Sequence, residues 1–115
     1  MRGTHPTSNF LTLTKAEEAA GIAISVVVDV RSPLRSLADQ VIRSASSVPA
    51  NLAEGAGRTG QDRFYHWKVA YGSAKEVDSH LRLLIGAGAV NTTRTQRALA
   101  LFDEVRAMTW RLLHP

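Results

Sequence analysis

Apolar side chains recur at alternating steps of three and four residues through much of this sequence, which is the spacing of a buried stripe on an α-helix. Three such stripes are unambiguous: Leu34, Ala38, Val41, Ala45, Val48 and Leu52; then Trp67, Ala70, Ala74, Val77, Leu81 and Leu84; then Ala98, Leu101, Val105, Met108 and Leu112. A chain of 115 residues has room for a single hydrophobic core. We therefore predict at least three helices that share one core.

The segment before these stripes, GIAISVVVDV (21–30), is rich in β-branched residues, which favour strands. Its apolar positions nevertheless keep a helical period, at Ala16, Ala19, Ala23, Val26 and Val30. No other stretch alternates apolar and polar residues, so a strand here would have no partner for its hydrogen bonds. We predict a fourth helix, and hence an all-α, antiparallel up-down-up-down four-helix bundle over residues 14–115, preceded by a flexible tail at residues 1–13.

Polar residues beside the stripes predict where the helices begin. The expected signals are Ser32 as N-cap with Pro33 at the first helical position, and capping-box pairs at Thr14 with Glu17 and at Thr93 with Gln96. The glycines of LLIGAGAV (83–90) are expected to end the third helix.

Pro49 lies within the stripe that runs from Leu34 to Leu52, although a proline in a helix interior costs about 3 kcal/mol. Either a new helix begins there, capped by Ser46 or Ser47, or one helix continues with a kink. Because the stripe keeps its phase from Ala45 through Val48 to Leu52, we predict a single helix kinked at Pro49.

Gly55, Gly57 and Gly60 have the Gly-x-Gly-x-x-Gly spacing of a dinucleotide-binding loop. That loop requires a strand immediately before the first glycine, and the residues before Gly55 form a helical stripe instead. We interpret these glycines as the end of one helix and the turn into the next, and we predict no cofactor.

Polar residues form a second stripe on each of the two central helices. One comprises Ser47, Asn51, Glu54 and Arg58, and the other comprises Ser73, Glu76 and His80, beside Gly72. We expect Asn51, Glu54 and Arg58 to pair with Ser73 and Glu76, within one chain or between subunits, and to brace the kink. A mid-helix glycine also predicts close approach of another backbone at Gly72. A metal site is disfavoured, because di-metal bundles repeat a Glu-x-x-His motif that is not present here.

The segments SVPANLAEGAGR (47–58) and FYHWKVAYGSAKEVDSHL (64–81) resemble the signature of the four-helix-bundle proteins encoded in intervening sequences of bacterial 23S rRNA genes. The matching positions are Ser47, Pro49, Ala50, Asn51, Ala53, Glu54, Gly55, Arg58, Phe64, Gly72, Ser73, Glu76 and Leu81. The likeness runs from about Lys15 to the C-terminus. The sequence departs from the family pattern in a short first connection, in Arg43 standing alone where two arginines are common, and in lacking an early aromatic residue in the first helix.

This resemblance implies a homo-oligomer, a pentamer of bundles with a barrel-like form, and no assigned catalytic activity. A related accessory protein of diversity-generating retroelements binds nucleic acid and its reverse transcriptase through a basic surface. The resemblance therefore implies a nucleic-acid or ribonucleoprotein adaptor whose partners are RNA, DNA or a nucleic-acid-processing protein. A purely structural or protein-interaction bundle is the alternative.

The residue composition is compatible with a polyanionic partner, since the net charge is +4 and 11 of the 14 basic residues are Arg. Lys68, Lys75 and Arg82 lie seven residues apart on one helical stripe, with Tyr65 nearby, and Arg43 and Arg58 are further candidates for phosphate contacts. A solvated basic face is the alternative.

A subunit interface is predicted by large apolar residues beside the main stripes, namely Leu83, Ile85, Leu99, Phe102, Trp110 and Leu113.

No serine lies in a strand-to-helix elbow, so we predict no catalytic residue. The absence of cysteine fits the reducing cytoplasm, and the most apolar run, residues 19–30, is too short for a membrane span, so we expect a cytoplasmic protein without a membrane partner.

Overall fold

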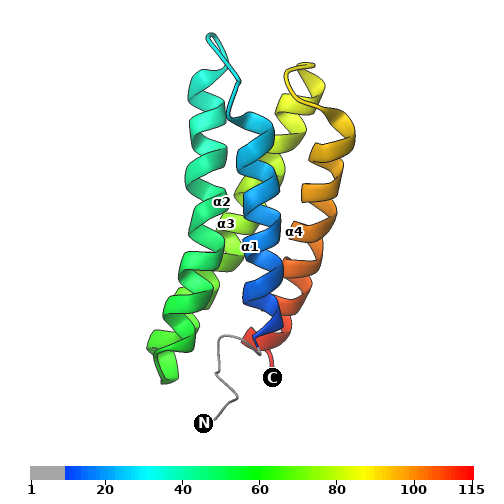
Figure 1. The fold of residues 1–115 in the computed structure, drawn as a ribbon. Coiled ribbons are helices and arrows are strands. Elements are labelled where there is room, and N and C mark those ends of the chain that lie inside the picture. The colour runs from blue at the N-terminus through cyan, green and yellow to red at the C-terminus, as the bar shows by residue number, and fades with distance from the viewer. Residues whose placement is uncertain (1–9) are drawn as a thin grey trace.

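The computed structural model describes residues 10–115 and contains four helices, with no strand in that range. They are α1 (Leu11–Val27), α2 (Arg35–Ala56), α3 (Gly60–Gly86) and α4 (Thr92–Leu113). Figure 1 shows the chain rising through α1, descending through α2, rising through α3 and descending through α4. The prediction of an all-α four-helix bundle is confirmed, including a helix where β-branched residues favoured a strand.

Each helix packs against its two neighbours: α1 and α3 each contact both α2 and α4. The core therefore lies along the central axis of a rod 47 Å long. All six stripe residues of α3 are buried, as are Ala38, Val41, Ala45, Val48 and Leu52 of α2. Within the described residues, no helix combines the length and the hydrophobicity that crossing a membrane requires.

The buried face of α4 is wider than its predicted stripe. Phe102 is fully buried and Leu99 is 7% exposed, so both belong to the core of this chain and the prediction that they form a subunit interface is wrong. The reason is that α4 packs between α1 and α3, which buries a broad apolar face where a narrow seam was assumed. Leu83 and Trp110 do remain exposed.

Helix α1 begins earlier than expected. Its first residue is Leu11, and Phe10 occupies the N-cap position without a side-chain cap, so the capping box predicted at Thr14 is wrong. The helix extends three residues ahead of residue 14, where the bundle was predicted to begin. The Phe10 ring lies 6.0 Å from the Trp67 ring and supplies an aromatic group at the start of the helix. Burial of Thr12 and Leu13 in this first turn outweighs the missing cap, which is worth about 1 kcal/mol. Most of the predicted flexible tail, residues 1–9, lies outside the described residues.

The starts of α2 and α4 also differ from prediction. Ser32 and Pro33 lie in the turn before α2, which begins at Arg35. There the Arg35 guanidinium donates to the carbonyl oxygens of Val28 and Val30, both at 3.1 Å, and so ties the end of α1 to the start of α2. Helix α4 is capped by Asn91, whose side-chain oxygen accepts from the Arg94 backbone N–H at 2.8 Å.

Helix α2 continues without a break through Pro49. The alternative of a new helix at this residue is excluded, and the kink itself stays a prediction. Gly55 lies inside α2, Gly57 is its C-cap, and Gly60 begins α3 with a φ of 61°. The three glycines therefore end one helix and start the next, as predicted.

Candidate nucleic-acid interface

Part of the predicted polar stripe joins α2 to α3. The hydroxyl oxygens of Ser47 and Ser73 lie 2.9 Å apart. Asn51 donates through Nδ2 to the Ser47 carbonyl oxygen at 2.9 Å and to its hydroxyl at 3.1 Å, while Oδ1 lies 3.0 Å from Nδ1 of His66. His66 was not expected in this network; its place seven residues, or two turns, ahead of Ser73 on the same face of α3 is the signal that could have indicated it.

Glu54 and Arg58 do not reach Ser73 or Glu76 within one chain. Arg58 lies beyond the end of α2, where it donates to Glu54 at 2.7 and 2.9 Å and to Asp62 of α3 at 2.8 Å. The hydrogen bond to Glu54, and next the one to Asp62, raise the pKa of Arg58. Glu76 is exposed and forms no ion pair among the described residues.

The backbone approach predicted at Gly72 is not found within this chain, and a close contact with a side chain occurs at Gly55 instead. A Cβ at Gly72 would meet nothing within 4 Å in this chain, whereas one at Gly55 would lie 2.6 Å from two ring atoms of Trp67. Trp67 donates to the Leu52 carbonyl oxygen at 3.3 Å, and Arg63 donates to that of Gly55 at 3.0 Å. This contact was missed, although Val48, Leu52 and Gly55 continue the spacing of the buried stripe.

The basic stripe of α3 lies along its groove with α4. Lys68, Lys75 and Arg82 are exposed, and each lines a different hollow between the two helices, of about 420, 650 and 400 Å³ respectively. Lys68 and Lys75 form no ion pair among the described residues, and neither does Arg111, which lines the Lys75 hollow from α4. We name this surface, defined by Lys68, Lys75, Arg82 and Arg111, the α3–α4 groove.

Arg82 differs from the two lysines because it is paired. It donates to Asp78 at 2.7 Å, a hydrogen bond that raises the pKa of Arg82. The Asp78 side chain is only 12% exposed, and its second oxygen lies 3.4 Å from Arg106 of α4, which also bonds Asp103 at 2.7 Å. The ion pair between Asp78 and Arg106 therefore links α3 to α4, a role that was not predicted from the sequence. We call this ion pair the clasp.

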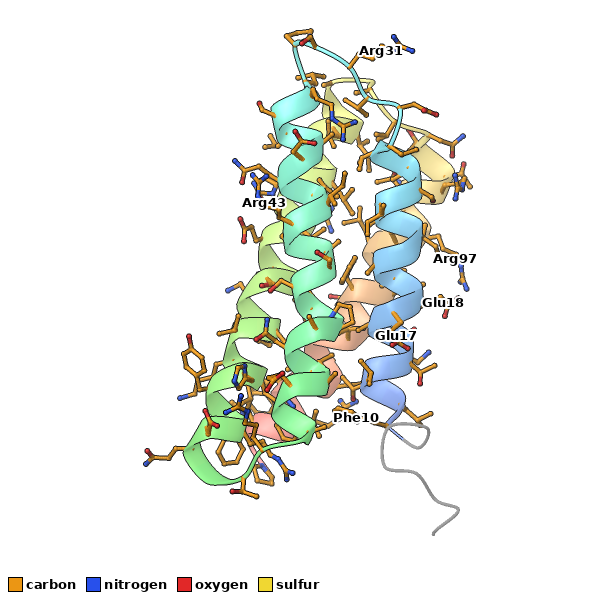
Figure 2. The ribbon with its side chains drawn as sticks, turned by 60° about the vertical axis from the view of Figure 1, so that its left-hand side comes forward. Phe10, Glu17, Glu18, Arg31, Arg43 and Arg97 are labelled. Carbon is orange, nitrogen blue, oxygen red and sulfur yellow. The ribbon has the colours of Figure 1, made fainter. Side chains whose placement is uncertain are left out.

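Two predicted basic residues lie elsewhere. Arg58 is neutralised by its two carboxylate partners at the turn between α2 and α3. Arg43 is exposed on α2, on the side away from α1 in Figure 2. Neither residue lines the α3–α4 groove.

The α1–α4 side of the bundle carries balanced charge. Arg97 pairs with Glu18 at 3.0 Å, as their labelled positions in Figure 2 illustrate, and Lys15 pairs with Glu104 at 3.0 Å. A third cation on this side, Arg94, forms no ion pair among the described residues and donates to the Ser25 hydroxyl at 2.6 Å. The α3–α4 groove differs in that Lys68, Lys75 and Arg111 are all without a carboxylate partner in the part of the chain that the structure describes.

Two aromatic side chains are exposed beside the unpaired cations. Tyr65 is 61% exposed and lines the Lys68 hollow, and Trp110 is 50% exposed and lines the Lys75 hollow. The His114 ring stacks on Trp110 with centroids 4.0 Å apart. The groove thus combines positive charge with aromatic surface.

The carboxylates and histidines considered for a metal do not gather at one point. Glu54 is bonded to Arg58, Glu76 is exposed, and Nδ1 of His80 is buried without a hydrogen-bond partner. Across residues 10–115, no group of three His, Asp or Glu side chains could hold a metal ion.

Residues 14–111 match the family described as 23S rRNA-intervening sequence protein. The fold resembles the crystal structure of a protein of unknown function from the S23 ribosomal protein family of Bacteroides thetaiotaomicron VPI-5482. The TM-score is 0.81 at 18% identity, and the likeness covers 90% of this chain and 99% of the other. No curated protein matches the sequence. Because the family match spans most of the sequence and the fold agrees with it, this chain belongs to the 23S rRNA-intervening sequence protein family.

Proposed function

We propose that this protein is a non-enzymatic, self-associating cytoplasmic adaptor that binds RNA or DNA along the α3–α4 groove. The observation that carries the proposal is the row of hollows in this groove, two of which hold cations without ion-pair partners. Phosphates attract such cations and release counterions when they bind, so nucleic acid gains affinity from them. A paired residue such as Arg58 would have to break an ion pair with a carboxylate before it could bind a phosphate, which lowers the gain in affinity.

The proposal is tested by titrating a labelled oligonucleotide of mixed sequence at several salt concentrations. The test variant is Lys68→Gln with Lys75→Gln. The control variant is Arg31→Gln with Arg43→Gln, which removes the same charge from two exposed residues outside the groove. Each phosphate contact contributes about 1 to the slope of log K against log salt. We expect the test variant to lose roughly 2 from this slope and the control to keep it.

Equal losses in both variants would show that net charge alone drives binding, and would overturn the assignment of the groove. No salt-dependent binding by the wild type at low ionic strength would overturn the nucleic-acid role and favour the purely structural bundle.

Self-association is the second part of the proposal, and a pentamer is the state implied by the family resemblance. Large apolar side chains that stay exposed in the single chain support it, among them Leu83 at 58% and Leu11 at 65%. Sedimentation at micromolar concentration is the direct test. A single monomeric species would overturn this part of the proposal.

A further inference from the structure

We infer that the α3–α4 groove binds a single strand, whose bases stack on Trp110 and Tyr65; this inference rests on the proposed function. The groove offers both components of a single-strand site, namely cations for the phosphates and flat aromatic surfaces for the bases. These components occur together in the two neighbouring hollows lined by Lys68 and Lys75.

The Lys75 hollow is the larger of the two, at about 650 Å³. The indole of Trp110 is half-exposed and lines this hollow together with Tyr71, Lys75, Asp103, Arg106, Ala107 and Arg111. The Asp103 carboxylate in the hollow is paired with Arg106 at 2.7 Å. The ammonium group of Lys75 lies 6.0 Å from the centroid of the Tyr71 ring, which holds the cation at the hollow. His114 stacks on the indole and hydrogen-bonds the Trp110 carbonyl oxygen at 2.8 Å, so the aromatic platform is fixed before any ligand arrives.

The Lys68 hollow repeats this arrangement. Tyr65 is exposed there beside Lys68, and Leu113 near the end of α4 forms the opposite wall. Lys68 and Lys75 are separated by two helical turns, roughly 10 Å along α3. A single strand can follow this distance and place a base in each hollow. The third hollow lacks an aromatic residue, and its Arg82 is paired with Asp78.

A double helix and a second copy of this chain both fit the groove less well. In a duplex the base faces are stacked on one another, so none is free to stack on Trp110 or Tyr65, and only the phosphates could contact the groove. A second copy carries the same net charge of +4 and supplies no polyanion for Lys68, Lys75 and Arg111. A flexible single strand provides phosphates and free base faces together.

The test compares a mixed-sequence single strand with a hairpin duplex of the same length, using fluorescence anisotropy at several matched salt concentrations. We expect the wild type to bind the single strand about tenfold or more tightly than the duplex. Trp110→Leu should weaken single-strand binding by a similar factor, leave the slope against salt unchanged, and leave duplex binding unchanged. Trp110→Phe keeps an aromatic ring and should recover much of the loss.

Val28→Ala is the control, because Val28 is 55% exposed at the end of α1 and lines none of the three hollows. It should bind as the wild type does. Tryptophan emission provides a second readout: Trp67 is 8% exposed, so quenching by the single strand should come from Trp110 and disappear in Trp110→Leu.

The possible results separate the two proposals. Equal binding of single strand and duplex, or a Trp110→Leu protein that binds the single strand normally, would overturn the stacking inference and leave the nucleic-acid role intact. Failure of the wild type to bind either ligand would overturn both.

Discussion

Gly55→Ala tests the contact that closes the turn between α2 and α3. An alanine Cβ at this position would lie 2.6 Å from Cδ1 and Nε1 of Trp67 and 3.1 Å from the backbone oxygen of Arg63. Carbon atoms in contact prefer about 3.5–4.0 Å, so the indole would have to move by roughly 1 Å. The indole is 8% exposed and packs against Phe10 and Phe64, which leaves it little room.

Three contributions set the size of the effect. Overpacking of this kind costs about 1–3 kcal/mol, and the loss of the hydrogen bond from Trp67 to Leu52 costs about 1 kcal/mol. The helical preference of Ala over Gly returns about 1 kcal/mol. The free energy of unfolding should therefore fall by about 1–3 kcal/mol, which for a chain of 115 residues lowers Tm by roughly 4–12 °C.

The assay is thermal unfolding followed by circular dichroism at a fixed protein concentration, because the proposed self-association would make Tm depend on concentration. Gly21→Ala is the matched control: Gly21 is an exposed residue of α1, and an added Cβ there would meet nothing within 4 Å. The control should be as stable as the wild type or more stable. If Gly55→Ala behaves like this control, the close approach to Trp67 carries no energetic weight and the reasoning is refuted.

Three further substitutions can be measured in the same assay. Asn51→Ala removes the hydrogen bonds to Ser47 and His66 and should cost about 1–2 kcal/mol; an unchanged Tm would mean that this network does not stabilise the bundle. Asp78→Ala leaves Arg106 without one of its two carboxylate partners and should cost about 1–3 kcal/mol, and wild-type stability would contradict the clasp. Gly72→Ala should gain up to about 1 kcal/mol with unchanged oligomer mass, since an added Cβ meets nothing in this chain; a loss of mass would instead place Gly72 in a subunit contact.

The positions of the helices could be predicted from the sequence because a buried helix face repeats at a fixed period. The stripe residues between Ala38 and Leu52, and those between Trp67 and Leu84, are buried as their three- and four-residue spacing predicted. The starts of the helices were harder to predict, because α1 gains its first turn from tertiary contacts of Phe10 and Leu13 that no local capping motif announces.

The candidate site could be predicted only in part. A spacing of seven residues was enough to place Lys68, Lys75 and Arg82 on one side of α3. It could not show that α4 completes the Lys75 hollow with Trp110 and Arg111, since this depends on which helices are neighbours. Nor could it show that Arg58 and Arg82 are paired, because a residue's ion pairs depend on the conformation of its side chain.

Photo-cross-linking tests the central claim most directly. A single-stranded oligonucleotide carrying 4-thiouridine would be irradiated with the wild-type protein, and the cross-linked peptides would be identified by mass spectrometry. We predict cross-links in the first half of α3, around Tyr65 to Lys75, and near the end of α4, around Trp110, which together line the two aromatic hollows. Cross-links concentrated on α1 or on the outer face of α2 around Arg43 would contradict the account.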